Sequence, residues 1–391
     1  MSYVTPWNYR RTVLLVCTLG FVATMTARVV ISPVVPDLTI SFDVSTGAIG
    51  LALTGMWATY ALAQFPSGVL ADRFGARSVV LLSLAGTCVA SLLLALSPSY
   101  LTFVFLAVIL GGAAGMVYSA AAILVTKHAA ETGRAMGIFI AGGPFAGLLA
   151  PPAAAALGTR YGWEAAVALG AVVALPALVL FSLRIESTPP TDPQRSVRER
   201  VDGKTALEIL SRPAIARTVV LAVLGAFTWQ ATASFLPAFL EAFRGFSRTD
   251  ASLLFSAYFL IHGLSMPLIG ILSDRYSRDA AATLTMGAGV AGYTLLVIAT
   301  STIATIGAIV LIGLAMSWGA PLQSRFMDLL SEAELGTGFG LVRTVYMLLG
   351  ALGSVVTGVV VDVVGWQAAF TLLAGCMTLA TLVLVADRVV K

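Results

Sequence analysis

The sequence predicts an all-α membrane protein with twelve transmembrane helices, arranged as two pseudo-symmetric bundles of six. Three observations support this fold class. Hydrophobic residues make up 58% of the 391-residue chain and charged residues only 11%, and the mean hydropathy is +0.94. Apolar runs long enough to cross a bilayer recur along the chain, and the two halves of the sequence repeat one another. A soluble domain could not bury so much apolar surface, so the bilayer must be the solvent.

A helix needs about 20 apolar residues to cross ~30 Å of hydrocarbon. Twelve runs of that length are expected to span the membrane, at approximately 12–34, 46–70, 77–97, 101–125, 135–157, 164–184, 213–240, 250–272, 281–300, 303–327, 337–361 and 367–386. A membrane β-barrel would instead show segments of about ten residues that alternate between apolar and polar. Residues 79–96 are apolar all round, which favours helices.

One polar, proline-bearing segment interrupts the hydrophobic pattern and divides the spans into six and six. We therefore expect an N-terminal bundle at 1–184, a cytoplasmic linker at 185–212 and a C-terminal bundle at 213–391. Residues 205–210 of the linker are predicted to form a short amphipathic turn on the membrane surface.

Basic residues gather on one side of the predicted spans, the side that also carries both termini and the linker. This asymmetry predicts that both termini are cytoplasmic, in a multi-pass protein of the plasma (inner) membrane. The net charge of +4 suits an anionic inner leaflet and requires no nucleic acid. The three cysteines have no metal-ligand spacing, so no metal and no cofactor are expected.

A duplication is visible in the loops that follow spans two and eight. Residues 68–77 read GVLADRFGAR and residues 270–278 read GILSDRYSR, so Asp72 and Asp274 stand 202 positions apart. Gly162-Trp163 and Gly365-Trp366 repeat at an offset of 203. Parallel repeats of this kind place a solute site between the two halves near the middle of the membrane.

At these loops the sequence resembles the major facilitator superfamily, whose G-x-L-x-D-R-x-G-x-R/K signature is met by Gly68, Leu70, Asp72, Arg73, Gly75 and Arg77. The second copy keeps Asp274 and Arg275 but has Ser277 in place of a glycine. The resemblance implies that this loop latches the cytoplasmic side in one state of an alternating-access cycle. The alternative is that the arginines only anchor the topology, which leaves the repeated glycines and aspartate unexplained.

Two subgroup resemblances point to different substrates. Residues 28–36 and 60–68 are similar to the organic anion symporter and to related carboxylate, cyanate and sugar-phosphate branches, in which the residue equivalent to Arg28 meets the charge of the substrate. Residues 142–147, followed by Pro151 and Pro152, partly resemble the glycine-proline motif of drug-proton antiporters. A proton-coupled multidrug or metabolite exporter therefore stays open as an alternative.

Ionisable residues inside a membrane are costly and need an explanation. Arg28 and Arg343 lie within spans one and eleven, Arg325 lies near the inner end of span ten, and no aspartate or glutamate falls in the middle of a predicted span. An anionic substrate would supply the missing counter-charge, and a guanidinium matches a carboxylate or phosphate geometrically. The alternative is that these arginines extend to the headgroups.

The predicted function is secondary active transport of a small anion such as a carboxylate, by a monomer that co-transports a proton or exchanges one anion for another. His262 is the candidate for proton coupling, with a neutral hydrogen-bonding role as the alternative. A non-transporting membrane sensor is a further alternative. No nucleotide-binding loop or H-E-x-x-H motif is present, so no enzymatic activity is expected. The remaining candidate substrate contacts are Tyr60, Gln64, Tyr118, Gln230 and Trp318.

Overall fold

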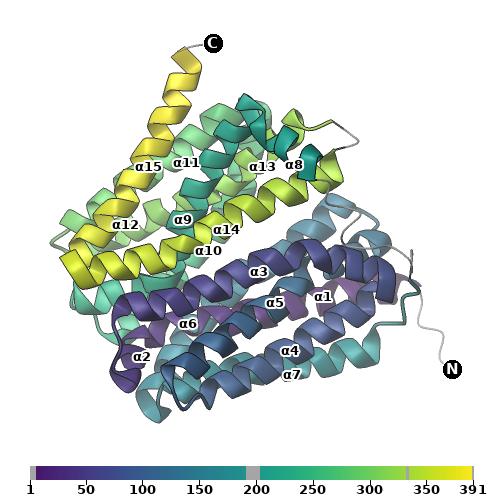
Figure 1. Cartoon of the computed structure of the whole chain (residues 1–391), viewed down its shortest axis with the longest axis horizontal. Coiled ribbons are helices and arrows are strands. Elements are labelled where there is room, and N and C mark those ends of the chain that lie inside the picture. The colour runs from purple at the N-terminus through teal and green to yellow at the C-terminus, as the bar shows by residue number, and fades with distance from the viewer. Residues whose placement is uncertain (1–5, 191–202, 332–333, 390–391) are drawn as a thin grey trace. The chain divides into compact units, whose positions relative to one another are not determined.

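The computed structural model describes residues 6–190, 203–331 and 334–389. Twelve helical segments in these ranges are long and apolar enough to cross a membrane, which confirms the predicted fold class. Residues 191–202 of the predicted linker lie outside the described ranges. The elements (Figure 1) are α1 Pro6–Val29, η1 Ser32–Val34, α2 Val35–Phe42, α3 Thr46–Phe74, α4 Ala76–Ala95, α5 Tyr100–His128, α6 Thr132–Tyr161, α7 Trp163–Arg184, α8 Gly203–Ser211, α9 Pro213–Ala242, α10 Arg248–Arg275, α11 Arg278–Ile298, α12 Thr302–Ala315, η3 Met316–Trp318, α13 Gly319–Leu329, α14 Leu335–Val364 and α15 Trp366–Val389.

Two predicted spans are interrupted, and proline explains both interruptions. Proline has no N–H to donate to the carbonyl four residues earlier. Pro33 therefore leaves Val29 without its usual helical donor, and α1 ends there before the 3-10 turn η1. Pro321 does the same to Ser317, which lies within η3 between α12 and α13. The first and tenth spans are thus each built from two α-helices joined by a 3-10 turn.

The chain divides into two compact units. Unit 1 comprises the described parts of Met1–Val34 and Gly55–Glu199, and unit 2 those of Val35–Thr54 and Arg200–Lys391. In unit 1, α1 packs against α6 and α7, and α4 packs against α5 and α7. The buried side chains between these helices form an apolar cluster that includes Val13, Phe21, Leu84, Val117, Phe139 and Phe181.

In unit 2, α9 packs against α14, and α11 packs against α12 and α15. Glycines allow α14 to approach α9 closely, because a Cβ atom at Gly353 would lie 2.2 Å from the Phe227 carbonyl oxygen. The predicted amphipathic turn is a nine-residue helix, α8, whose Ile209 is buried while Leu207 is exposed.

The duplication seen in the sequence is also a duplication of contacts. A Cβ atom at Gly111 would lie 2.0 Å from the Met56 carbonyl oxygen, and one at Gly313 would lie 3.0 Å from the Tyr258 carbonyl oxygen. Both members of the second pair stand 202 positions after those of the first. The same small residue therefore admits the same neighbouring backbone in each half.

Candidate substrate and gating sites

Arg28 lies near the C-terminal end of α1 and is almost completely buried, with 3% of its surface exposed. Its Nε donates to the Thr24 carbonyl oxygen at 3.1 Å, and one Nη contacts the Met25 sulfur at 3.4 Å. No carboxylate in the described ranges forms an ion pair with Arg28. A buried guanidinium without a carboxylate is costly, so its environment must offer other stabilisation.

Two aromatic rings of α3 provide part of that stabilisation. The guanidinium carbon of Arg28 lies 3.8 Å from the centroid of the Tyr60 ring and 4.9 Å from that of Trp57. Each such cation–π contact is worth roughly 0.5–2 kcal/mol. Trp57 was not among the sequence-predicted residues, although its spacing of three from Tyr60 places both on one helix face. A guanidinium that lies over aromatic rings presents its N–H donors at its edge, where a planar anion can bind them.

Close packing of α3 against α5 fixes the position of these rings. A Cβ atom at Gly115 would lie 2.4 Å from the Tyr60 carbonyl oxygen, so only glycine permits the approach. The Thr59 hydroxyl, on the residue before Tyr60, donates to the Val108 carbonyl oxygen of α5 at 2.7 Å. The aromatic side of the Arg28 site is therefore held by a rigid helix pair.

The other two candidates of unit 1 lie on different contacts. The Tyr118 ring packs between Phe21 and Phe139, with centroid distances of 5.7 Å to each. The Gln64 side chain is buried, and its backbone carbonyl accepts a hydrogen bond from Ser119 Oγ at 2.9 Å. Tyr118 thus packs against the apolar cluster of unit 1.

In unit 2, Trp318 packs between α9 and Tyr346 of α14, the helix that also carries Arg343. The Trp318 ring is buried against α9, where a Cβ atom at Gly225 would lie 2.6 Å from it. Its other side meets Tyr346 edge to face, with centroids 6.1 Å apart. Arg343 stands three residues before Tyr346 on α14, on the same helix face, and is partly exposed.

Gln230 and His262 are polar groups of unit 2 with one unsatisfied atom each. Gln230 Nε2 donates to the Met347 carbonyl oxygen at 3.1 Å, while its Oε1 is buried and finds no donor among the described residues. His262 lies on α10, and its Nδ1 is buried with no partner in the same described set. Close by, Ser265 and Ser317 share a 2.7 Å hydrogen bond that ties α10 to η3. Gln230 Oε1 can therefore accept a further hydrogen bond, and His262 Nδ1 can accept or donate one according to the tautomer of the ring.

The loop of residues 68–77, the first copy of the repeated motif, is fastened to the end of α7. Gly75 has a φ of 83°, and a Cβ atom there would lie 2.1 Å from the Thr188 carbonyl oxygen. Arg77 donates from Nε to the Ile185 carbonyl oxygen at 2.7 Å and from Nη2 to that of Ser182 at 2.8 Å. The guanidinium thus satisfies carbonyls that a helix C-terminus leaves unpaired, at the negative end of the helix dipole.

The rest of this loop lies on the last two turns of α3. Gly68 and Asp72 are partly buried, and Arg73 is exposed with its guanidinium 5.1 Å from the Phe74 ring centroid. A gating role for these residues stays a prediction.

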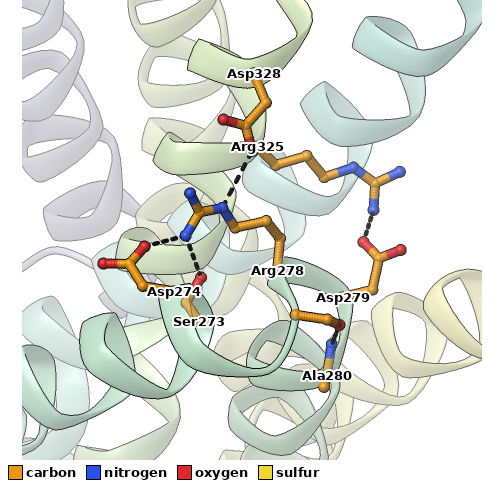
Figure 2. Close-up of polar contacts among 8 residues, drawn as sticks. Ser273, Asp274, Arg278, Asp279, Ala280, Arg325 and Asp328 are labelled. Carbon is orange, nitrogen blue, oxygen red and sulfur yellow. Dashed lines mark hydrogen bonds and ion pairs between the residues drawn. The ribbon is translucent and has the colours of Figure 1, made fainter.

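The second loop is built differently, as Figure 2 shows. Arg278 pairs with Asp274 one turn earlier and with Asp328 of α13 at 3.1 Å. Ser277 caps the start of α11, because its hydroxyl accepts a hydrogen bond from the Ala280 N–H at 2.9 Å. Charge pairs and a serine cap thus stand where the first loop has a glycine and a carbonyl-bound arginine.

The expectation that arginines in or near the spans lack a carboxylate is wrong for Arg325. Its guanidinium pairs with Asp279 at 2.5 Å, and only 8% of the residue is exposed. The two residues are far apart in sequence, and the packing of α11 against α13 brings them together. Arg275, at the end of α10, is exposed.

A contact between α3 and α14 within unit 2 was not predicted from the sequence. Both carboxylate oxygens of Asp362 accept backbone hydrogen bonds from the first turn of α3, at 2.9 Å from Thr46 N and 2.7 Å from Gly47 N. The Thr54 hydroxyl donates to the Ala351 carbonyl oxygen at 2.9 Å. We call these five residues the α3–α14 contact.

Two further features accompany this contact in unit 2. A Cβ atom at Gly50 would lie 2.6 Å from the Ser354 carbonyl oxygen, so the helices touch backbone to backbone. Arg248, at the start of α10, pairs with Asp37 at 2.7 Å and lies 3.7 Å from Glu241. Asp37, Glu241 and Asp362 all lie near the ends of spans, and the sequence did not indicate which residues they pair with.

Comparisons with known proteins agree with this architecture. The chain is 28% identical to the probable sulfoacetate transporter SauU of Cupriavidus necator, over 89% of this chain and 86% of that protein. It is 21% identical to the hexuronate transporter of Bacillus subtilis, over 92% and 90% of the two chains. Over 46% of this chain and 42% of the relative, it is 27% identical to the membrane sensor protein UhpC of Escherichia coli.

Solved structures share the fold. The nucleoside transporter NupG superposes with a TM-score of 0.82 at 14% identity, covering 97% of this chain and 99% of that one. The family model described as Major Facilitator Superfamily matches residues 17–247 and again residues 218–390. The chain is a multi-pass membrane protein that belongs to the major facilitator superfamily of secondary transporters.

Proposed function

We propose that this protein carries a small organic anion, of the carboxylate or sulfonate class, across the plasma membrane with both termini in the cytoplasm. The observation that carries the proposal is Arg28, a buried guanidinium that lies over two aromatic rings and forms no ion pair with a described carboxylate. The names of the SauU and hexuronate relatives support the same substrate class.

Arg28 suits a substrate contact for physical reasons. Two of its N–H groups bind within α1, and a guanidinium has five. The ring faces hold the group in one orientation without neutralising it, since a cation–π contact leaves the formal charge unchanged. An entering carboxylate or sulfonate therefore supplies the missing charge and accepts two hydrogen bonds at once.

We further propose that the two ends of α3 act in opposite phases of the transport cycle. Thr46 and Asp72 stand at opposite ends of one membrane-spanning helix, and hence at opposite faces of the membrane. The α3–α14 contact engages the first end, and residues 68–77 form and continue past the second. Access from the Thr46 side requires release of Asp362 from α3, whereas the resemblance assigns closure of the other side to Asp72.

The coupling partner is proposed to be a proton or an exchanged anion. His262 has a buried ring nitrogen without a described partner and lies next to the Ser265–Ser317 bond. A histidine so placed can hold a proton during transport. Replacement by Gln would abolish dependence on a pH gradient if His262 carries the proton, and would leave it intact if the substrate carries its own.

Uptake into proteoliposomes tests the substrate class. Wild-type protein is expected to accumulate an anion from a panel of monocarboxylates, dicarboxylates, sulfonates, sugars and cationic drugs. Arg28→Gln should reduce anion uptake at least a hundredfold, since a hydrogen bond to a charged group contributes about 1.5–3 kcal/mol and two are lost. Arg28→Lys should remain impaired, because an ammonium cannot donate two parallel hydrogen bonds to one anion as the planar guanidinium does.

Arg160→Gln, an exposed arginine at the far end of α6, is the matched control and should transport normally. Full anion uptake by Arg28→Gln, or a preference of the wild type for cations, would refute the proposal in favour of the exporter alternative. Absence of transport for the whole panel by a folded wild-type protein would instead favour the sensor.

A further inference from the structure

A basic pocket in unit 1 lies far from the residues proposed to meet the substrate. Its volume is about 440 Å³, within the range of small-ligand sites. Arg10 and Arg11 of α1 and Arg134 of α6 line it, together with Glu131 and His128. Arg11 and Arg28 lie on the same helix, 17 residues apart, which corresponds to ~26 Å along the axis. The pocket is therefore a separate site from the one proposed for the transported anion.

The charge of the pocket favours an anion. Three arginines against one glutamate leave a net charge of +2 with a neutral histidine. The N-terminus of α6, a 30-residue helix, adds partial positive charge beside Arg134. Its N-cap residue, Glu131, makes no side-chain capping hydrogen bond, so the carboxylate does not occupy the N–H groups of the first turn. A phosphate group at this position gains both guanidinium and helix-terminus interactions.

The walls of the pocket add a second requirement for the ligand. Below the arginines, Leu14, Leu15, Val125 and Ile138 line the pocket with apolar surface. Leu15 is 64% exposed and Ile138 is 41% exposed, on segments that cross the membrane. Apolar surface on a membrane span packs against hydrocarbon, and an acyl chain joined to the bound headgroup supplies that hydrocarbon directly below the arginines. The ligand that matches both parts has a charged head and a hydrocarbon tail.

His128, which forms part of the pocket wall, is held in a fixed orientation. His128 Nδ1 lies 2.9 Å from the Leu124 carbonyl oxygen, and the ring meets Tyr9 edge to face with centroids 5.4 Å apart. These two contacts hold the imidazole in one orientation in the wall of the pocket. This side of the pocket is therefore already ordered, which lowers the entropic cost of binding a ligand there.

We propose that this pocket binds an anionic phospholipid, with the phosphate at Arg10, Arg11 and Arg134 and an acyl chain along Leu15 and Ile138. Basic pockets between transmembrane helices at the level of the headgroups are suited to such lipids. The site is independent of the transported substrate, so it persists whichever solute the protein carries.

Native mass spectrometry of the full-length protein, with dioleoyl-phosphatidylglycerol as the probe and dioleoyl-phosphatidylcholine as the neutral-headgroup comparison, tests the proposal. Wild-type protein should retain one tightly bound phosphatidylglycerol in preference to phosphatidylcholine. The double variant Arg10→Gln/Arg134→Gln should bind it at least tenfold more weakly, and the matched Arg160→Gln control should bind it normally. Equal binding of the two lipids by the wild type, or unchanged binding by the double variant, would overturn the proposal.

Two further measurements keep the result independent of how the variants fold. A photoactivatable phosphatidylglycerol should crosslink to wild-type peptides containing residues 10–15 and 134–138, and crosslinking confined to other peptides would refute the site. Glycerol 3-phosphate, which has the phosphate but no acyl chain, should compete only weakly. Competition at the same concentration as the lipid would make the pocket a site for soluble anions and would contradict the proposal.

Discussion

The two copies of the repeated loop, at residues 68–77 and 270–279, match in sequence but are held by different interactions in the structure. In the first copy, Gly75 takes a φ of 83° and Arg77 binds backbone carbonyls at the end of α7. In the second, Ser277 is an ordinary N-cap, and the position equivalent to Arg77 is Asp279, which pairs with Arg325. One half thus uses backbone fit and the other uses charge pairs. A duplicated motif can therefore keep its place in the fold while it exchanges the interactions that hold it.

The largest expected effect tests the charge pair of the second copy. Asp279→Ala removes the carboxylate that pairs with the buried Arg325 and should destabilise the protein by about 3 kcal/mol, since breaking a buried ion pair is costly. Thermal unfolding in detergent measures the loss. The added change Arg325→Met should restore much of the stability, and a double variant no more stable than Asp279→Ala would show that the pair is not the cause.

The next largest effect is expected when Gly75 and Ser277, which occupy equivalent positions in the two loops, are exchanged. Gly75→Ser forces a side chain into a left-handed backbone conformation and against the Thr188 carbonyl, with an expected loss of about 2 kcal/mol. The reciprocal Ser277→Gly should cost only a few tenths of a kcal/mol, because glycine is an acceptable N-cap. Similar midpoints of thermal unfolding for the two variants would remove the proposed distinction between backbone fit and capping.

A kinetic effect should separate the aspartates of the two loops. Asp72→Asn is expected to slow turnover about tenfold and leave the apparent affinity within about twofold, since one charge-assisted hydrogen bond of a gate is worth roughly 1.5–3 kcal/mol. Asp274→Asn is the matched change in the second copy, where Arg278 keeps Asp328 as a partner, and its turnover should stay near that of the wild type. An equal loss of substrate affinity in Asp72→Asn would place that residue in the binding site.

The smallest effect concerns acid stability. Arg212 pairs with Glu334 at 2.6 Å, and this arginine, with hydrogen bonds from Ser331, lowers the pKa of Glu334 from 4.5 to about 2. A lowered pKa means that the pair contributes fully above the ordinary value and is lost as the pH falls toward 2. The difference in thermal midpoint between wild type and Glu334→Gln should thus be constant from pH 7 to pH 5 and shrink below about pH 4.5. A difference that shrinks at neutral pH would contradict the ion pair.

Much of the fold followed from the sequence because the bilayer imposes its thickness on every span and the duplication marks equivalent positions. Gly111 and Gly313 matched in sequence, and they also admit equivalent backbones in space. The pairings of Asp362 with α3 and Asp279 with Arg325 could not be predicted in this way. Each joins residues distant in the chain, and hydropathy carries no information on which helix ends meet.

The Arg28 site was predicted in part, unlike the matched glycines, which were predicted, and the distant pairings, which were not. Arg28 and Tyr60 were predicted from the sequence. Trp57 was not, although its spacing of three from Tyr60 places both rings on one face of α3. Tyr118 had the residue type expected of a binding site but packs against the apolar cluster of unit 1. Residue type alone does not separate an aromatic ring that contacts a ligand from one that fills a core.

The hydrogen bonds from Thr46 and Gly47 to Asp362 also bear on how the chain is made. The N–H groups of a first helical turn usually bond to the side chain of the residue just before the helix, whereas Thr46 and Gly47 donate to a carboxylate that lies 316 and 315 positions later in the chain. During synthesis the ribosome completes α3 long before α14 exists, so the Thr46 and Gly47 N–H groups must rely on water or lipid headgroups until the last helices insert, whereas Ala48 N already donates to Ser45 Oγ at 3.2 Å. The start of an early helix is thus finished by one of the last parts of the protein to be translated.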